Sequence, residues 1–305
     1  MKANLAVEIG KLRLNNPVMV ASGTFGYAEE FKDFLDLKKL GAIVTKTITL
    51  KPRKGNPGPR TCETIGGMLN SIGLETPGLD SFIKDKLPFL RKLGVPIIMS
   101  VASEEAPEEF PELMSRLDKI EEVAAIELNI SCPNVQGKEG LISQDPGATH
   151  KIVQEARKIT DKTLIAKLSP NVTSISAIAK SAEDAGADAV SLINTLSGMS
   201  IDVEQRRPKV ACVTAGLSGP AIRPVAVKMV WEVFNKVKIP VIGMGGIMDV
   251  ESALEFIIAG SSAVSIGTAN FINPRISADI ASGLKEYLIK NKIIDIKELV
   301  GSLRI

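Results

Sequence analysis

The sequence contains very little histidine and cysteine, and this shortage excludes several kinds of catalytic and metal-binding site. His150 is the only histidine among 305 residues. We expect it on an exposed helix without a functional role, and we expect neither a histidine base nor a histidine-ligated metal. The three cysteines, Cys62, Cys132 and Cys212, share no metal-ligand spacing, and their odd number does not indicate a disulfide framework. A reduced, cytoplasmic compartment fits this cysteine usage best.

Long apolar runs and an excess of one charge are missing as well. No run of about 18 apolar residues is present, so no membrane-spanning helix is expected. The N-terminal segment also lacks the apolar region of a signal peptide. The 37 basic and 35 acidic residues give a net charge of +2, which argues against a dedicated nucleic-acid surface. Only 4% of the residues are aromatic, so the core is expected to consist mainly of Ile, Val, Leu and Ala.

Short apolar runs recur eight times, and each is followed by an amphipathic stretch. Their valine and isoleucine content indicates strands that are buried on both faces, as in parallel sheets. The predicted strands cover residues 17–21, 42–46, 96–101, 125–130, 164–168, 189–193, 240–243 and 263–267. The predicted helices cover residues 29–39, 79–92, 107–122, 147–160, 172–185, 221–236, 250–259 and 276–290.

Eight such units in about 290 residues match the size of a closed (β/α)8 TIM barrel. A doubly wound open sheet is the competing architecture, but no Gly-x-Gly-x-x-Gly loop follows the first strand. The residues after the eighth helix leave no room for a sizeable second domain. We therefore predict an α/β protein with a single TIM-barrel domain over residues 1–305.

Three connections exceed the usual two to six residues, namely 47–78, 131–146 and 194–220. All three follow strands, so we expect them on the C-terminal face, where barrel enzymes place their active sites. Polar residues and glycines also gather at the strand ends. They are Ser22, Lys46, Thr47, Ser100, Asn129, Lys167, Asn194, Thr195, Gly245, Gly246, Gly267 and Thr268. Each alone fits a helix cap or a turn, but those roles do not explain why all of them meet at one rim.

The glycines after the last two strands predict a phosphate site. Backbone N–H groups can approach an anion closely at glycine, and the start of the following helix favours negative charge. Lys46 and Lys167 interrupt apolar runs, so they could neutralise negative charge on a bound cofactor or on an anionic substrate.

Cys132 begins the second long loop, within the segment NISCPN at residues 129–134. An unperturbed cysteine has a pKa of about 8.5, so it can act as a general base where its surroundings favour the thiolate. Cys62 and Cys212 are expected to be small buried apolar residues. Amide side chains suited to a planar, amide-rich ligand stand at Asn70, Asn129, Asn134 and Asn194.

Several of these segments resemble motifs of class 1 dihydroorotate dehydrogenases. Residues 129–134 resemble the catalytic loop of that family, and MLNSIGLETPG at residues 68–78 resembles its substrate loop. Other similar segments are residues 21–26, 166–171, 192–195, 217–223 and 243–247. The resemblance extends from about residue 4 to about residue 290. Its details look most like class 1B, whose members pair with a second, electron-transferring subunit.

The resemblance implies that the protein uses FMN to oxidise dihydroorotate to orotate, a step of pyrimidine biosynthesis. Cys132 would take a proton from C5 while a hydride passes from C6 to the flavin. The implied contacts of the flavin ring are Ser22, Lys46, Thr47, Asn129, Lys167 and Ile193. The implied contacts of its phosphate are Gly219, Gly245, Gly246, Gly267 and Thr268. The implied contacts of the substrate are Lys46, Asn70, Ser71, Ile72, Gly73, Leu74, Asn129, Asn134, Asn194 and Thr195.

The resemblance also implies a homodimeric core that joins an FAD and iron–sulfur subunit in a heterotetramer and passes electrons to NAD. Direct use of fumarate, as in class 1A, is the alternative. The chain departs from the family pattern at Ser100, where an asparagine that contacts the flavin is expected. It also departs from the usual loop sequence at residues 135–140.

Two other functions compete with this interpretation. A tRNA-dihydrouridine synthase would share the barrel and FMN, but such enzymes carry a helical RNA-binding domain and a more basic surface. The sequence indicates neither feature. A barrel that binds a phosphate ligand without catalysis would leave the position of Cys132 among asparagines unexplained.

Overall fold

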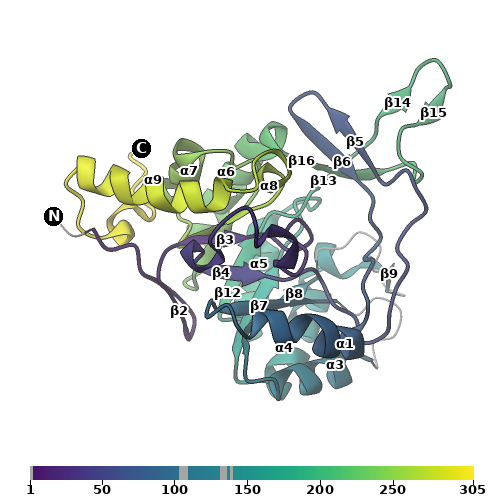
Figure 1. The fold of residues 1–305 in the computed structure, drawn as a ribbon, viewed down its shortest axis with the longest axis horizontal. Helices are drawn as coiled ribbons and strands as arrows, with labels where there is room; N and C mark the ends of the chain where they lie inside the picture. Colours follow the sequence, from purple (N-terminus) through teal and green to yellow (C-terminus); the bar gives the residue numbers. More distant parts are fainter. Residues whose placement is uncertain (1–2, 103–108, 131–135, 138–139) are drawn as a thin grey trace.

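The eight predicted strands form one closed parallel barrel in a computed structural model, which describes residues 3–102, 109–130, 136–137 and 140–305 (Figure 1). Each strand pairs with the next along the chain, and the last pairs with the first through Val264 and Val18. The predicted (β/α)8 barrel is therefore confirmed. The barrel strands are β3 (Val18–Val20), β4 (Ala42–Val44), β7 (Ile97–Val101), β8 (Val123–Asn129), β11 (Thr163–Lys167), β12 (Ala189–Leu192), β17 (Val241–Gly243) and β18 (Ala263–Ile266).

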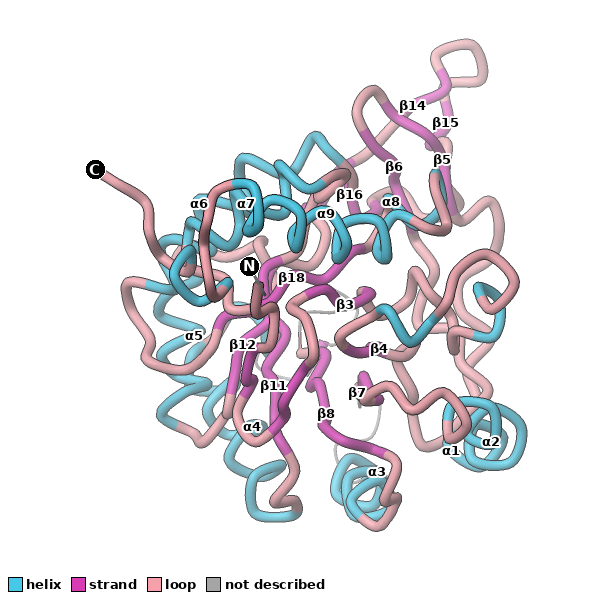
Figure 2. Tube along the Cα trace, turned by 60° about the vertical axis from the view of Figure 1, so that its left-hand side comes forward, coloured by secondary structure: helices cyan, strands magenta, loops and turns pink. Residues whose placement is uncertain are grey.

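Helices surround the barrel on the outside (Figure 2). Six of the predicted helices are present with small shifts in their ends. They are α3 (Glu109–Asp118), α4 (Pro146–Ile159), α5 (Ile175–Asp184), α6 (Arg223–Phe234), α7 (Val250–Ala259) and α9 (Ile276–Lys290). The start of α5 is set by Ser174, whose hydroxyl accepts the N–H of Ala177 at 3.3 Å.

Residues 29–39 do not form the continuous helix that the sequence predicts. Two short 3-10 turns stand there instead, η1 (Glu29–Phe31) and η2 (Leu37–Lys39). The Asp36 carboxylate accepts the N–H of Lys38 at 3.1 Å, so it starts a new turn where a longer helix would continue.

Residues 79–90 are helical as predicted, but the helix widens in its middle. It consists of α1 (Leu79–Ser81), a π-helical turn η3 (Phe82–Lys86) and α2 (Leu87–Leu90). Pro88 has no N–H to donate to the carbonyl four residues earlier, which accounts for irregular hydrogen bonding around it.

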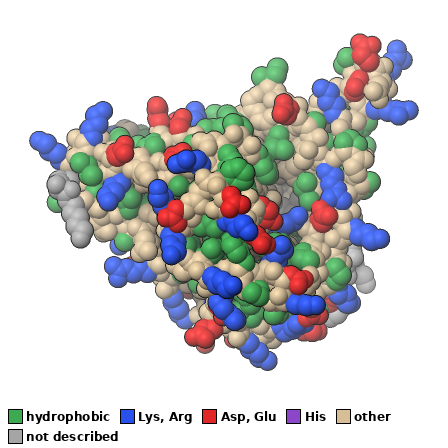
Figure 3. All heavy atoms as spheres, viewed as in Figure 1, with side chains coloured by type: hydrophobic (Ala, Val, Ile, Leu, Met, Phe, Trp, Pro, Cys, Tyr) green, Lys and Arg blue, Asp and Glu red, His purple; other side chains and the backbone are tan. Residues whose placement is uncertain are grey.

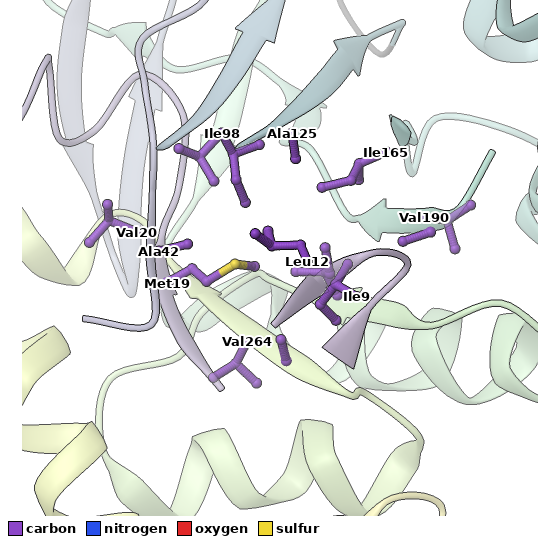
Figure 4. Close-up of a cluster of buried hydrophobic side chains, with 14 of the residues drawn as sticks. Ile9, Leu12, Met19, Val20, Ala42, Ile98, Ala125, Ile165, Val190 and Val264 are labelled. Carbon is purple, nitrogen blue, oxygen red and sulfur yellow. The ribbon is translucent and has the colours of Figure 1, made fainter. Parts of the chain in front are cut away.

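A hairpin before the first barrel strand closes the amino-terminal end of the barrel. It consists of β1 (Val7–Ile9) and β2 (Leu12–Leu14). Its Ile9 and Leu12 side chains lie among the barrel side chains of Figure 4. The N–H of Lys11 donates to the hydroxyl of Thr163, the first residue of β11, at 3.0 Å. Gly10 has a φ of +57°, and a Cβ there would lie 2.7 Å from the Cβ of Asp188, so only glycine fits this turn.

Two of the three long connections meet in a second sheet that projects from the barrel (Figure 1). It is antiparallel, with the order β13 (Leu196–Gly198), β16 (Ala215–Ser218), β6 (Gly67–Asn70) and β5 (Thr61–Thr64). We call it the arm sheet. The strand pair β14 (Ile201–Asp202) and β15 (Arg207–Pro208) extends beyond it. The remaining short elements are β9 (Gln136–Gly137), β10 (Gly140–Leu141), η4 (Ile142–Gln144), η5 (Pro220–Ile222), α8 (Ala269–Ile272) and η6 (Ile296–Leu299).

The composition of the core agrees with the sequence, because aliphatic side chains fill most of it and few aromatic rings take part. Cys62 and Cys212, which were expected to be buried, are only partly buried. Basic and acidic side chains alternate over the face shown in Figure 3. In the part of the chain that the structure describes, no helix is both long and apolar enough to cross a membrane.

The hairpin that closes the barrel yields a prediction about stability. Replacing the fully buried Ile9 by alanine removes core contacts and leaves a cavity, so we expect a loss of about 3 kcal/mol of unfolding free energy. Val203→Ala is the matched control, because Val203 is 77% exposed on the projecting strand pair. Equilibrium urea unfolding measures both changes. Equal losses in the two variants would show that the hairpin adds nothing to the core.

Candidate active site

The carboxyl ends of the barrel strands open into a cavity of about 560 Å³. Strand ends form its floor, and the loops that carry the arm sheet form one wall. All described residues that the sequence analysis assigned to a site line this cavity. They are Ser22, Lys46, Thr47, Asn70, Ser71, Ile72, Gly73, Leu74, Asn129, Lys167, Ile193, Asn194, Thr195, Gly219, Gly245, Gly246, Gly267 and Thr268.

Two predicted site residues, Cys132 and Asn134, lie outside the described residues, so their predicted roles stay predictions. The chain that leads to them is described as far as Ile130. Asn129 ends β8 with only 8% of its surface exposed and lines the cavity. The described part of this strand therefore reaches the cavity at Asn129.

Hydroxyl and amide groups join the ends of four neighbouring strands in the floor. The Thr47 hydroxyl lies 3.1 Å from that of Ser22 and 2.9 Å from that of Ser100, and it accepts the Asn129 amide at 3.2 Å. Ser100, expected to replace a flavin-contacting asparagine, is fully buried and is not among the cavity-lining residues. Its hydroxyl bonds Thr47 instead, so Ser100 supports the floor from below.

Lys46 and Lys167 bring positive charge to this floor. Lys167 ends β11 and is 5% exposed, and Lys46 follows β4 with its N–H bonded to the Gly26 carbonyl at 2.9 Å. Among the described residues neither lysine forms a salt bridge. Burying a cation without an opposite charge is costly, so the buried Lys167 favours an anionic ligand, and the partly buried Lys46 adds positive charge to the same cavity.

A buried carboxylate lies below the floor. Glu127 is 2% exposed and stands two residues before Asn129 on β8. Its Oε2 accepts the Ser191 hydroxyl at 2.8 Å, across the strand that carries Lys167. Its Oε1 has no hydrogen-bond partner among the described groups. The sequence analysis did not identify this acid, because it lies inside an apolar run.

Three glycines form a cradle at one side of the cavity. Gly219, Gly245 and Gly246 have φ values of +98°, +130° and +74°. A Cβ on Gly246 would lie 2.7 Å from the Gly219 carbonyl, and one on Gly219 would lie 2.7 Å from the Cα of Gly67. Side chains are therefore excluded at these positions, and all three glycines line the cavity with backbone alone. The Thr268 hydroxyl, which donates to Ser218 at 2.8 Å, stands beside this cradle.

The helix that follows the Gly245–Gly246 turn, α7, begins with a capping carboxylate. Asp249 caps α7, and its carboxylate accepts the N–H of Ser252 at 2.8 Å. This hydrogen bond holds the pKa of Asp249 below its usual value. The carboxylate thus already supplies negative charge at this helix start.

Asparagines organise the opposite wall. The Asn70 amide donates to the Gly216 carbonyl at 3.3 Å, which links β6 to β16. Asn171 donates to the Thr195 carbonyl at 3.0 Å and accepts the N–H of Ser197 at 2.9 Å. These bonds fix the loop that begins at Asn194.

The sequence analysis missed several lining residues. Asn171 ends the similar segment 166–171, and Ser218 precedes Gly219 within segment 217–223, so those motifs contained a usable signal. Ser197 and Thr214 reach the cavity only because β13 pairs with β16, and no local pattern indicates that pairing. Others missed are Ala21, Gly23, Thr24, Thr61, Met68, Glu75, Ala215, Gly216, Ile222, Met244, Ile247, Met248, Ala269 and Phe271.

In the described part of the chain, no group of three or more His, Cys, Asp or Glu side chains could hold a metal ion. His150 lies on α4 and is partly exposed.

Comparisons with known proteins match nearly the whole chain to one family. A family model described as dihydroorotate dehydrogenase matches residues 4–288. A protein of Trichlorobacter lovleyi is 56% identical over 303 residues, which cover 99% of both chains. Proteins of Geotalea uraniireducens and a Thermoanaerobacter species are 54% and 52% identical over 302 residues, again with 99% of each chain covered. All three are named dihydroorotate dehydrogenase B (NAD(+)), catalytic subunit.

Proposed function

Because the chain belongs to the dihydroorotate dehydrogenase family, we propose that it oxidises dihydroorotate to orotate with FMN as the immediate electron acceptor. The observation that carries this proposal is a single cavity whose wall combines a glycine cradle, two lysines and several asparagines. The proposal treats residues 1–305 as one FMN-binding domain.

The cradle suits the phosphate of FMN. Gly219, Gly245 and Gly246 line the cavity without side chains, so an anion can approach their backbone. Gly267 and Thr268 add backbone and a hydroxyl group from the neighbouring strand end. This arrangement follows the general use of the last two strand ends of a barrel for phosphate.

The floor suits the flavin ring. Thr47, Ser22 and Asn129 form a hydrogen-bonded set at the strand ends, so their donors and acceptors have fixed positions. Ile193 adds an apolar contact. When bound, FMN would supply a conjugated ring that accepts a hydride. Lys167 favours negative charge next to that ring, because its ammonium group is largely shielded from water.

The wall formed by residues 70–74 and 194–195 suits dihydroorotate, a small ring with two amide groups and a carboxylate. Asn70 and Asn194 each offer a donor and an acceptor to such amides, and Lys46 offers a cation to the carboxylate. Contacts from opposite sides of the cavity would hold the ring in one orientation. Such positioning lowers the barrier to reaction.

We assign the role of general base to Cys132. Loss of a proton from C5 and of a hydride from C6 creates the C5–C6 double bond of orotate, so a base must lie beside the substrate. Cys132 follows Asn129 by three residues, and Asn129 is part of the cavity floor. A thiol with a pKa near 8.5 needs only a modest shift to accept a proton at neutral pH.

The relatives are named as NAD(+)-linked catalytic subunits. We therefore propose that electrons leave this chain through a partner subunit with FAD and an iron–sulfur cluster, and that NAD is the final acceptor. The complex would be a heterotetramer built on a homodimer of this chain. We also propose a cytoplasmic location, based on the cysteine usage.

A first prediction of the proposed function concerns the reduction of FMN by dihydroorotate. Anaerobic mixing of the purified, FMN-loaded protein with dihydroorotate should bleach the flavin absorbance and yield one orotate per flavin. Bound FMN that stays oxidised would contradict the substrate assignment. Rapid reoxidation of the isolated chain by fumarate would favour the class 1A alternative over the NAD-linked complex.

The second prediction concerns the cradle. Gly246→Ala places a Cβ against the Gly219 carbonyl, so we expect most of the FMN to be lost on gel filtration. Gly94→Ala is the matched control, because Gly94 also has a positive φ, of +66°, but a Cβ there meets nothing within 4 Å. Flavin content per chain measures both. Equal retention of FMN would argue against a phosphate at the cradle.

The third prediction concerns the base. Cys132→Ser replaces the thiol by a much weaker base, so flavin reduction by dihydroorotate at pH 7 should slow by at least about 100-fold. The FMN content should stay unchanged. Stopped-flow absorbance measures the rate, and reduction at the wild-type rate would exclude Cys132 as the base.

A further inference from the structure

Asn56 bonds the predicted substrate loop but is not among the residues that line the cavity. Its backbone N–H donates to the Ile72 carbonyl at 2.9 Å. Its side-chain amide donates to the Ser71 carbonyl at 3.2 Å and to the Ser71 hydroxyl at 3.0 Å. Asn56 thus forms hydrogen bonds with two consecutive residues of the loop, Ser71 and Ile72, both of which line the cavity.

The two segments touch too closely for other residue types. A Cβ on Gly73 would lie 2.5 Å from the Asn56 amide, and one on Gly55 would lie 2.5 Å from the Ile72 carbonyl. Both glycines have positive φ values, of +74° and +70°. Gly73 therefore packs directly against Asn56, and a shift of Asn56 would displace Gly73.

The loop conformation needs such support. Leu74 has a φ of +52°, in the left-handed region that side chains with a Cβ disfavour. It follows Gly73, which is left-handed too, and both residues line the cavity. A strained segment at a binding site keeps its shape only where its surroundings fix it.

Arg60 holds Asn56 in turn. Its Nε donates to the Asn56 carbonyl at 2.5 Å, and its own carbonyl accepts the N–H of Ser71 at 2.7 Å. Its guanidinium also bonds the Glu75 carboxylate at 2.6 Å, farther along the same loop. Arg60 thus supports the loop directly at Ser71 and Glu75, and through Asn56 it also supports the bonds to Ser71 and Ile72.

We propose that Asn56 is a positioning residue for the substrate: it holds residues 71–74 in the conformation that faces the cavity. The inference rests on the proposed function, since that function assigns these residues to dihydroorotate. When Asn56 loses its amide, the loop spends more time in other conformations. The apparent affinity for the substrate then falls in proportion to the fraction of molecules whose loop keeps the binding conformation. The cradle and floor belong to other segments, so FMN binding is unaffected.

Two variants and one control test the proposal. Asn56→Asp keeps the size and the backbone N–H but removes both amide donors to Ser71. Asn56→Ala removes the whole side chain. Asn291→Ala is the matched control, because Asn291 is exposed and makes a comparable bond, from its amide to the Tyr287 carbonyl at 2.9 Å, far along the chain on the last helix.

The first measurement is orotate binding to the oxidised, FMN-loaded protein, followed by the change in flavin absorbance. Both Asn56 variants should bind orotate about tenfold more weakly, the effect expected from one or two lost hydrogen bonds. The FMN content and the limiting rate of reduction at saturating dihydroorotate should stay within about threefold of wild type. Asn291→Ala should match wild type throughout. A general loss of folding would instead lower FMN content and rate together.

The second measurement is amide hydrogen exchange of the apoprotein, which needs no ligand. Residues 70–75 should exchange faster in both Asn56 variants, and the barrel strands should not. Unchanged orotate affinity in the variants, or unchanged exchange in the loop, would overturn the proposal. A wild-type protein that binds no orotate would instead overturn the proposed function, while loop exchange would still decide whether Asn56 holds the loop.

Discussion

Closure of the parallel barrel is the constraint on which the rest of the structure depends. Each strand finds hydrogen-bond partners on both sides, so the barrel has no free edge. Because all strands run the same way, their carboxyl ends meet at one rim. Thr47 shows the consequence, since it joins Ser22, Ser100 and Asn129 from three other strands. Residues up to 107 positions apart in sequence become one floor because the barrel closes.

The features that the sequence predicted are those that a local pattern determines. Strands buried on both faces show as apolar runs, and α7 begins at a capping aspartate and ends at Gly260, so its predicted ends are correct. Once a barrel was inferred, residues after the strands had to gather at one face, and the predicted lining residues that the structure describes do so. The family motifs added residues 70–74, which no strand pattern would indicate.

The features that the sequence did not predict depend on contacts between distant segments. The arm sheet forms because Leu69 of β6 pairs with Leu217 of β16, although the two residues lie in loops separated by most of the barrel. Its strands are only a few residues long, so they leave no periodic signal. Glu127 was missed for a related reason: an acid inside an apolar strand is recognisable only when Ser191, two strands away, is seen to bond it. The break at Asp36 shows that one side-chain bond can interrupt a good helix pattern.

The cavity therefore has two walls with different origins. The floor and the cradle belong to strand ends and glycine turns, which barrel closure holds in place, and this suits the tightly held cofactor that we propose. The wall of residues 70–74 and 194–195, which we propose for the substrate, adjoins the arm sheet, whose small apolar cluster is formed around Leu69, Val210 and Ala215. Elements with few buried apolar contacts open at a lower free energy than the core. Under the proposed function, this division would let the substrate side move for ligand exchange while the cofactor side stays fixed. The proposed role of Asn56 would then place a side-chain amide, rather than a barrel strand, in control of the shape of the substrate loop.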